Sequence, residues 1–596
     1  MGCESNRLTL TMTTYLAMRS VDGLRSRVFL SGVRRRLLAA GVVTWLALSV
    51  STGALATVTP NPIVLENADA GASGWAATST PQENINGYAS EVSVLPGAVL
   101  HLHVSSAPAS RYRVEIYRLG WYDGAGARLM TCVPSCGGDE PGTAYPTPSP
   151  NPQTGEVVAG WPVTDTVPIG DDWTSGYYVA RLVRTSGYRA GFAADVPFIV
   201  REPPGTDSTI LVVAPVNTWE AYNGWGGKSL YTYNSGAVAA TEVSFDRPYT
   251  TSTAMLPFRY EYPLVRFLER GGYDVSYTTD SDVDADPGEL LAHQLVITAG
   301  HDEYWSSTMR DAYEGARDAG TNLAFLGANT GYWQMRYADD RRTIVEYRSA
   351  AADPEPDPAL KTVRFRDLLP PRPECSLLGV ESTGLGSEET DVAPFDVVVA
   401  DGAAGDPWFA GTGLYSGSVV PGIGGYEWDS TQPGCTQPGL KLLFHGDFGG
   451  EPFDAVRYAA RSGARVFSAG SIEFAWGLDG FSSGQNSDPA LERFMTNALE
   501  DLQRPARPVG VGVSIHARGK IVVSVPAPKD RRVYEIEVFR MKASASSGGR
   551  IVCKSLTWSC TDSRADRGSH VRYGVAYVDP WGTSGVALSR RIRVRP

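Results

Sequence analysis

Four loops in the middle of the chain collect side chains that can bind a metal ion or transfer a proton. Each loop directly follows a short apolar run of the kind that forms a buried strand, at 209–215, 295–298, 322–326 and 465–468. In chain order the loops contribute Tyr222, then His301 with Glu303, then Asn329, and last Glu473. Because ligands of open α/β sheets bind beyond the carboxyl ends of the strands, these residues predict one shared site.

His301 and Glu303 are two residues apart, so an extended backbone directs both side chains to the same side. A His beside a Glu suits a metal ligand next to a general acid or base. The alternative is that both residues end a strand in solvent. Tyr222 and Asn329 also have simpler interpretations, as a packed aromatic ring and as a residue suited to the backbone of a turn.

Glu473 stands in an otherwise apolar stretch that includes Ile472 and Phe474 to Trp476. A carboxylate in such surroundings is desolvated unless it is paired, and desolvation raises its pKa. Glu473 is therefore a candidate acid or base.

The acidic residues at 280, 282, 284 and 286 resemble a calcium-binding loop. However, Ala285 stands where that loop requires Gly, and no Glu follows at the required offset. We therefore expect a solvated loop at this position.

The elements that carry these loops belong to a multidomain chain. Alternating apolar and polar runs predict an N-terminal β-sandwich over residues 57–205. Strand-like runs alternate with helical stretches such as Tyr262–Arg270 over residues 206–503, which predicts a doubly wound, mostly parallel α/β domain. Alternating runs return in residues 504–596 and predict a C-terminal fibronectin-III-like sandwich. The expected fold class is α/β plus all-β.

The N-terminus has the features of an export signal. Arg34 to Arg36 precede the apolar run Leu37–Val50 and the small residues around Ala54 and Ala56. This pattern predicts a signal peptide at residues 1–56, cleaved after Ala56, and a secreted protein. The apolar run is shorter than the roughly 20 residues of a membrane span. Whether the adjacent arginines make it a twin-arginine signal stays open.

Charge and cysteine content agree with an exported protein. Without residues 1–56 the chain has 46 basic and 63 acidic side chains, a net charge of −17, which argues against a nucleic-acid partner. Six cysteines remain, and in an oxidising compartment they predict three local disulfides. A zinc site is the weaker alternative, because the pairs are scattered. The predicted pairs are Cys132 with Cys136, Cys375 with Cys435, and Cys553 with Cys560.

Several long, aromatic-rich segments resemble the large (beta) subunit family of N,N-dimethylformamidase. The resemblance covers residues from about 90 to 503, and its matching segments are Tyr117–Tyr122, Asn217–Gly227, Ser244–Tyr249, Gly300–Trp305, Gly327–Trp333 and Ala469–Trp476.

This resemblance implies an amidohydrolase that uses one iron ion. We expect the ion to be ferric, because phenolate and carboxylate are hard donors. Two tyrosines and a glutamate would bind the iron, and Tyr222 and Glu303 match two of them. The third ligand is expected in the sandwich, at Tyr178 or its neighbour Tyr177, with Tyr178 favoured. That would place the site between the sandwich and the α/β domain. The remaining catalytic residues would be His301, Asn329 and Glu473.

Two functions follow as hypotheses. The first is a secreted metal-dependent hydrolase of a small amide substrate, whose identity the exported chain leaves open. The second is a secreted surface or matrix binding protein whose sandwiches contact a polymer and whose α/β domain is not catalytic. A homo-oligomer is compatible with both.

Overall fold

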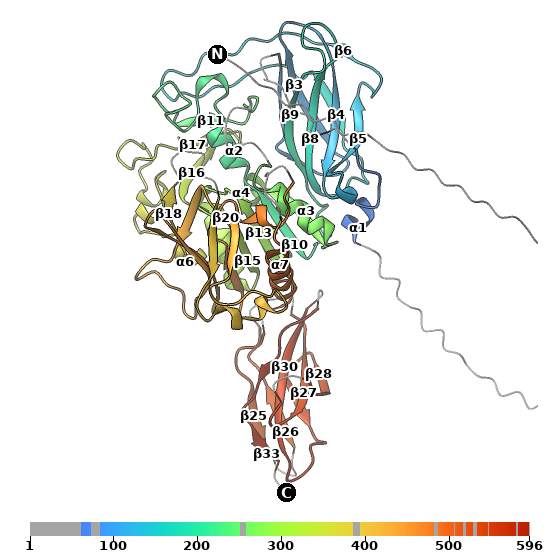
Figure 1. Cartoon of the computed structure of the whole chain (residues 1–596), viewed down its shortest axis with the longest axis vertical. Helices are drawn as coiled ribbons and strands as arrows, with labels where there is room; N and C mark the ends of the chain where they lie inside the picture. Colours follow the sequence, from blue (N-terminus) through green and yellow to red (C-terminus); the bar gives the residue numbers. More distant parts are fainter. Residues whose placement is uncertain are drawn as a thin grey trace, which may run out of the picture. The chain divides into compact units, whose positions relative to one another are not determined.

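The structure, a computed structural model, describes residues 61–72, 75, 84–250, 258–385, 394–481, 487–505, 507–516, 520–528, 533–545, 548–579 and 582–594. The predicted signal peptide lies outside these residues. The described chain is rich in β-strands and has few helices (Figure 1). In the part of the chain that is described, no helix combines the length and apolar character needed to cross a membrane.

Two sheets near the N-terminus share one apolar core. The first has the order β1 (Ile85–Ala89), β3 (Val99–Ser106), β7 (Asp165–Pro168). The second has the order β2 (Ser93–Val94), β9 (Ala193–Val200), β8 (Gly176–Arg184), β4 (Arg111–Leu119), β5 (Ala127–Val133), with β6 (Glu140–Pro141) beside β4. Leu102 of the first sheet and Val114 and Leu182 of the second are fully buried in the same cluster. The alternation in the sequence is the cause, because every second side chain of a strand points to the same face.

A nine-stranded sheet forms the middle of the chain. Its order is β12 (Val275–Thr279), β10 (Ile210–Ala214), β13 (Leu295–Gly300), β15 (Asn322–Gly327), β24 (Arg465–Ser468), β23 (Glu451–Ala459), β22 (Lys441–Phe448), β19 (Phe395–Val399), β20 (Val419–Gly424). The first five strands are parallel to one another. The remaining neighbours pair antiparallel.

The prediction of a mostly parallel sheet is therefore wrong, since the sheet is mixed. The run from β22 to β23 turns at Gly449 and Gly450, and a connection that short allows only antiparallel pairing. Apolar strand runs alone do not distinguish the two directions.

Both faces of the sheet are covered. In β10, Val212 lies in one apolar cluster and Val213 in another. Helices α3 (Tyr262–Arg270) and α7 (Pro489–Leu502) pack in the first cluster, and α5 (Ser307–Ala319) packs in the second. The expected α3 bounds are confirmed. Ser306 caps α5 by accepting the Met309 N–H, and Gly320 ends it with φ 114°.

The expected solvated loop at 280–286 is a short helix, α4 (Asp280–Ala285), and the prediction is wrong. Thr279 and Asp282 cap the helix reciprocally, and Asp280 is fully buried, where it accepts the Asn217 backbone N–H at 3.1 Å. Backbone N–H groups at a helix start offset part of the cost of burying such a carboxyl group.

Two further sheets with a common core lie near the C-terminus. One has the order β25 (Gly512–Ile515), β26 (Ile521–Ser524), β29 (Ser559–Asp562). The other has β28 (Arg550–Ser555), β27 (Glu535–Lys542), β30 (His570–Asp579) and β31 (Gly582–Thr583), with β32 (Ala587–Leu588) and β33 (Ile592–Arg593) also paired to β30.

Helix α1 (Pro62–Glu66) lies beside β5, and a further group of elements surrounds the carboxyl ends of the central strands. They are α2 (Val216–Tyr222), α6 (Cys375–Leu378), the sheet β11 (Glu242–Ser244), β17 (Thr343–Val345), β16 (Trp333–Ala338), β14 (Tyr304–Ser306), and the pair β18 (Glu381–Leu385) and β21 (Glu427–Ser430).

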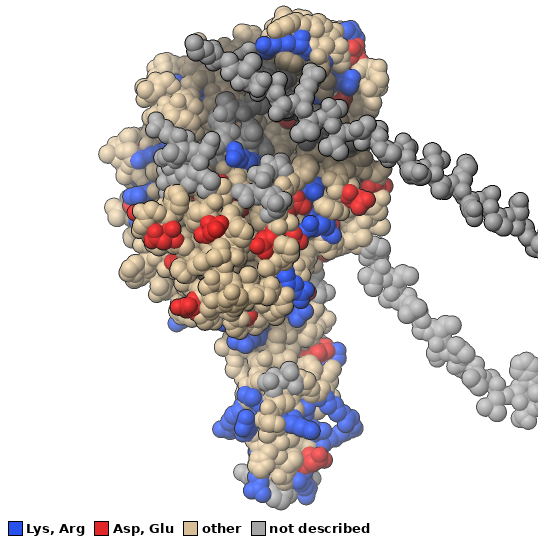
Figure 2. Space-filling view, viewed as in Figure 1, with Lys and Arg blue, Asp and Glu red and all other residues tan. Residues whose placement is uncertain are grey.

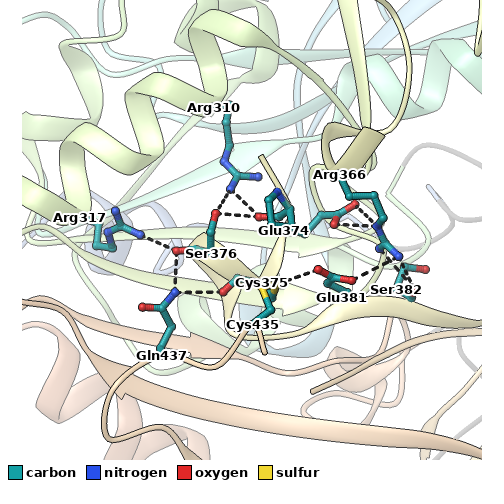
Figure 3. Close-up of a disulfide and its surroundings, with 11 residues drawn as sticks. Arg310, Arg317, Arg366, Glu374, Cys375, Ser376, Glu381, Ser382, Cys435 and Gln437 are labelled. Carbon is teal, nitrogen blue, oxygen red and sulfur yellow. Dashed lines mark hydrogen bonds and ion pairs between the residues drawn. A yellow bond between two sulfur atoms is a disulfide. The ribbon is translucent and has the colours of Figure 1, made fainter. Parts of the chain in front are cut away.

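All three predicted disulfides are confirmed: Cys132–Cys136, Cys375–Cys435 and Cys553–Cys560. Figure 3 shows the second of these at the start of α6. Beside it, the Gln437 side-chain amide donates to the Cys375 carbonyl at 3.2 Å and to the Ser376 carbonyl at 2.8 Å. The bridge and these hydrogen bonds attach the loop after β21 to α6.

Candidate functional site

Two tyrosine hydroxyls meet one carboxylate at the carboxyl ends of the central strands. The Tyr222 hydroxyl donates to Glu303 Oε2 at 2.9 Å, and the Tyr231 hydroxyl donates to the same oxygen at 3.0 Å. The two phenol rings stack with their centroids 4.1 Å apart. Tyr222 and Glu303 are 4% and 2% exposed and Tyr231 is partly buried, so these three oxygens converge in a site largely shielded from bulk water.

Local structure explains this convergence. Tyr222 is the last residue of α2, and Glu303 lies in the short connection between β13 and β14. The Glu303 backbone N–H donates to the Thr218 hydroxyl at 2.9 Å, which attaches that connection to α2. The His301–Glu303 stretch is thereby fixed against the helix that carries Tyr222.

A buried ion pair shapes the loop that joins Tyr222 to Tyr231. Arg247 and Glu220 are both fully buried, and Arg247 Nε lies 2.5 Å from Glu220 Oε1. The same guanidinium donates to the carbonyls of Asn223 at 2.9 Å and Lys228 at 2.7 Å. Such multiple hydrogen bonds suit the fixed fork of Arg, and they hold the loop in one conformation.

A second group of residues supports the far side of Tyr231. The Tyr304 hydroxyl donates to the Tyr231 hydroxyl at 2.7 Å. The Arg348 guanidinium carbon lies 4.0 Å from the centre of the Tyr231 ring, and Arg348 also donates to the Tyr304 hydroxyl. A cation over a phenol ring is favourable, and here it offsets the charge of the Glu303 carboxylate that the Tyr231 hydroxyl contacts.

His301 and Asn329 meet at a carboxylate that sequence reasoning did not identify. His301 Nε2 lies 2.9 Å from Glu427 Oε2 and 3.4 Å from Glu303 Oε2. The Asn329 side-chain amide donates to Glu427 Oε2 at 2.8 Å. Glu427, the first residue of β21, therefore connects the two predicted residues.

The electrostatics of this chain favour a charged imidazole. Burial by itself would lower the pKa of His301, but Glu427 and Glu303 raise it to about 9. His301 is 1% exposed, which excludes the alternative of a strand end in solvent. Asn329 has φ 54°, so it also suits the backbone of its turn, and its side-chain oxygen Oδ1 is buried without a hydrogen-bond partner.

Glu473 lies beside the segment that leads into Glu427. A side chain at Gly425 would place its Cβ 1.8 Å from Glu473 Oε2, so this approach requires glycine. Glu473 Oε2 is buried and has no hydrogen-bond partner. Burial raises the pKa of Glu473 to about 8, while Arg259 opposes the rise. The carboxyl is therefore protonated through much of the neutral range.

The structure does not bring Tyr178 to this site, and its assignment as a ligand is wrong. The Tyr178 hydroxyl donates to the Thr174 carbonyl at 2.7 Å, and its ring stacks on Trp173 in the sandwich core. Strand alternation puts the neighbouring Tyr177 on the other face of β8, against Trp219 and Phe258. Neither hydroxyl has a contact with Glu303 in the described structure, so neither tyrosine can complete the site at that carboxylate.

Tyr231 and Glu427 are the residues that the sequence did not reveal. Tyr231 stands nine positions after Tyr222 in a loop with several aromatic residues, and no spacing distinguishes it from Tyr233. Glu427 lies in an antiparallel strand outside the four predicted loops. The only available signal was a carboxylate between the aromatic residues Tyr426 and Trp428.

Comparison with known proteins identifies the family. The family described as N,N-dimethylformamidase beta subunit-like, C-terminal, matches residues 113–488. The chain belongs to this family. The matched range contains every residue of the Tyr222–Tyr231–Glu303 and His301–Glu427–Asn329 groups, and also Glu473. No curated protein matches the chain.

Not every segment that resembles the N,N-dimethylformamidase beta subunit-like family contributes residues to the site. In the segment Tyr117–Tyr122, the Arg118 guanidinium donates to both oxygens of Glu269, at 2.8 and 2.9 Å. Both side chains are fully buried, and they join β4 to α3. This motif therefore has a structural role.

Solved structures that are similar to this family member include fibronectin-III proteins. An Fn3-like protein from Clostridium thermocellum is 17% identical, covers 14% of this chain and 88% of its own, and has a TM-score of 0.13. The chicken CNTN1 FN1–FN3 domains are 11% identical, cover 36% of this chain and 62% of their own, and have a TM-score of 0.14.

Proposed function

We propose that the chain is an exported, iron-dependent hydrolase that cleaves the C–N bond of a small amide. Membership of the N,N-dimethylformamidase beta subunit-like family suggests amide hydrolysis. The observation that carries the proposal is the meeting of the Tyr222 and Tyr231 hydroxyls at one oxygen of Glu303.

The donor set fits a ferric ion. Two phenol oxygens and a carboxylate are hard, anionic donors once they are ionised, and such donors prefer a highly charged cation to a soft metal. Burial, followed by the charge of Glu303, raises the pKa of Tyr222 well above its usual value, so its ionisation needs a cation nearby. A bound ferric ion would polarise the amide carbonyl and acidify a water molecule.

The other residues have roles that follow from their surroundings. Glu473 in its ionised form, which a bound cation nearby would favour over the protonated form, would accept a proton from the attacking water as the water oxygen bonds to the acyl carbon. His301, held by Glu427, would deliver a proton to the leaving nitrogen, so that the amide and water yield a carboxylic acid and an amine. The unpartnered Asn329 Oδ1 would accept a hydrogen bond from the amide N–H of the substrate.

Metal analysis and an amide screen test the proposal. The purified chain should contain about one iron per molecule and a visible tyrosinate-to-iron absorption band, as expected for hard phenolate ligands. Glu473→Ala should abolish hydrolysis of any amide that the wild type cleaves, with the iron and its absorption band retained. Colourless, metal-free protein that cleaves no amide would favour the binding protein, and an active Glu473→Ala variant would remove Glu473 from the mechanism.

A further inference from the structure

Positive charge is concentrated at the C-terminal end of an otherwise acidic chain. Residues 504–596 contain 18 Lys and Arg against six Asp and Glu, whereas residues 1–503 contain 35 against 59. In Figure 2, Lys and Arg predominate on the visible face of the part that Figure 1 labels β25 to β33. The charge averaged over the whole chain hides this difference.

Part of this charge gathers where β33 pairs with β30. We name it the basic block, and it consists of His570, Arg572, Arg590, Arg591 and Arg593. The register of β30 and β33 places His570 directly opposite Arg593. Their neighbours Val571 and Ile592 are buried in the core, so strand alternation directs His570, Arg572 and Arg593 to the outer face.

The basic block has no acidic partner among the described residues. The Arg572 guanidinium donates instead to the Ser589 carbonyl at 2.8 Å, which brings it to the start of the Arg590–Arg593 run. Elsewhere in the same sheets some cations are paired, as Lys554 is with Glu537 at 2.5 Å and Arg540 with Asp562 at 3.0 Å. The block differs from these positions in gathering, at one place, several cations without an acidic partner in the described part of the chain.

Clustered cations of this kind cost stability in the free protein. Like charges close together on neighbouring strands destabilise the fold. An anion with repeated charges would remove this repulsion, and guanidinium groups bind carboxylates with two parallel hydrogen bonds.

We propose that the basic block binds an acidic polysaccharide through the carboxylates of its repeating units. The Cys553–Cys560 disulfide in the same part of the chain points to an oxidising compartment outside the cytosol, where such polymers occur and nucleic acid is scarce. The surface would hold the protein on a polymer whether or not the central site is catalytic.

Binding of polygalacturonate to the full chain without residues 1–56 tests this inference. The variant Arg572→Gln/Arg591→Gln/Arg593→Gln should bind about tenfold more weakly, and wild-type affinity should fall as salt rises from about 50 to 200 mM. The control Lys520→Gln/Lys542→Gln/Lys554→Gln loses the same charge from other exposed positions and should bind within about twofold of wild type. Thermal unfolding verifies folding, and Arg593→Gln alone serves if the triple variant is unstable.

Three results would overturn the inference. One is wild-type protein that does not bind polygalacturonate at low salt. Another is an equal loss of binding in both triple variants, which would indicate unspecific charge attraction. The last is equal or tighter binding of duplex DNA, which would make nucleic acid the partner.

Discussion

At the scale of single residues, the functional cluster depends on which side chains share a carboxylate oxygen. Glu303 Oε2 accepts hydrogen bonds from both Tyr222 and Tyr231, and Glu427 Oε2 is shared by His301 and Asn329. Two carboxylates thus organise the whole site. The loop after β13 already indicated Glu303 as a candidate, and only the coordinates identified Glu427.

Tyr231 can be distinguished from Tyr178 as an iron ligand by substitution. Tyr231→Phe removes a hydroxyl 3.0 Å from Glu303 Oε2 and should weaken iron binding by roughly 100-fold or more. It should also shift or remove the visible absorption band. Tyr178→Phe, the matched control, loses only a hydrogen bond to Thr174 and should keep full iron at a stability cost of about 1 kcal/mol. The reverse pattern in iron analysis would restore Tyr178 as the ligand.

The buried carboxyl of Glu473 predicts a dependence of stability on pH. Its folded pKa of about 8 lies above the ordinary value of 4.5, so the folded protein holds this proton more tightly than the unfolded chain. The stabilisation is complete below pH 4.5 and is lost as the pH rises to about 8. Glu473→Gln has no ionisable group at this position and does not lose this stabilisation. As the pH rises from 4.5 to about 8, its stability relative to wild type should therefore increase by a few kcal/mol, to order of magnitude.

Thermal unfolding of wild type and Glu473→Gln at several pH values measures how the ionisation of Glu473 changes stability. Glu500→Gln, a change at an exposed position of α7, should follow the wild-type pH dependence. A constant difference between Glu473→Gln and wild type across the range would contradict the raised pKa.

At the scale of secondary structure elements, buried ion pairs connect parts of the chain that are far apart in sequence. Arg247 and Glu220 fix the loop after α2, and Arg118 and Glu269 join β4 to α3. Each pair is desolvated, so removal of one partner leaves a charge that water cannot reach.

The Arg118–Glu269 pair allows a stability test. Glu269→Ala leaves the Arg118 guanidinium buried and uncompensated, which should cost about 3–5 kcal/mol in the free energy of unfolding. Arg270→Ala, at the next position of α3, removes a partly exposed pair with Glu492 and should cost about 1 kcal/mol or less. Denaturant unfolding compares the two variants, and similar losses would show that the buried pair is not needed to join β4 and α3.

At the scale of the whole molecule, the sequence predicted helix ends and disulfides better than the direction in which neighbouring strands pair. The bounds of α3, the caps of α5 and the three disulfides follow from local signals, namely Gly and Ser at helix ends and cysteines close in sequence. The antiparallel half of the central sheet was not predicted, because strand direction depends on connections and not on composition.

The amino-acid sequence by itself determined the family, the charge segregation and most of the site, because these depend on residue types and on motifs within single loops. Tyr222, His301, Glu303, Asn329 and Glu473 each follow a strand that is recognisable from its apolar run. Only the tertiary structure decided that Tyr231 joins Tyr222 at Glu303, that Glu427 joins His301 to Asn329, and that Tyr178 belongs to the sandwich core. Such pairings arise from long-range packing, in which a one-residue change of strand register turns a side chain to the opposite face.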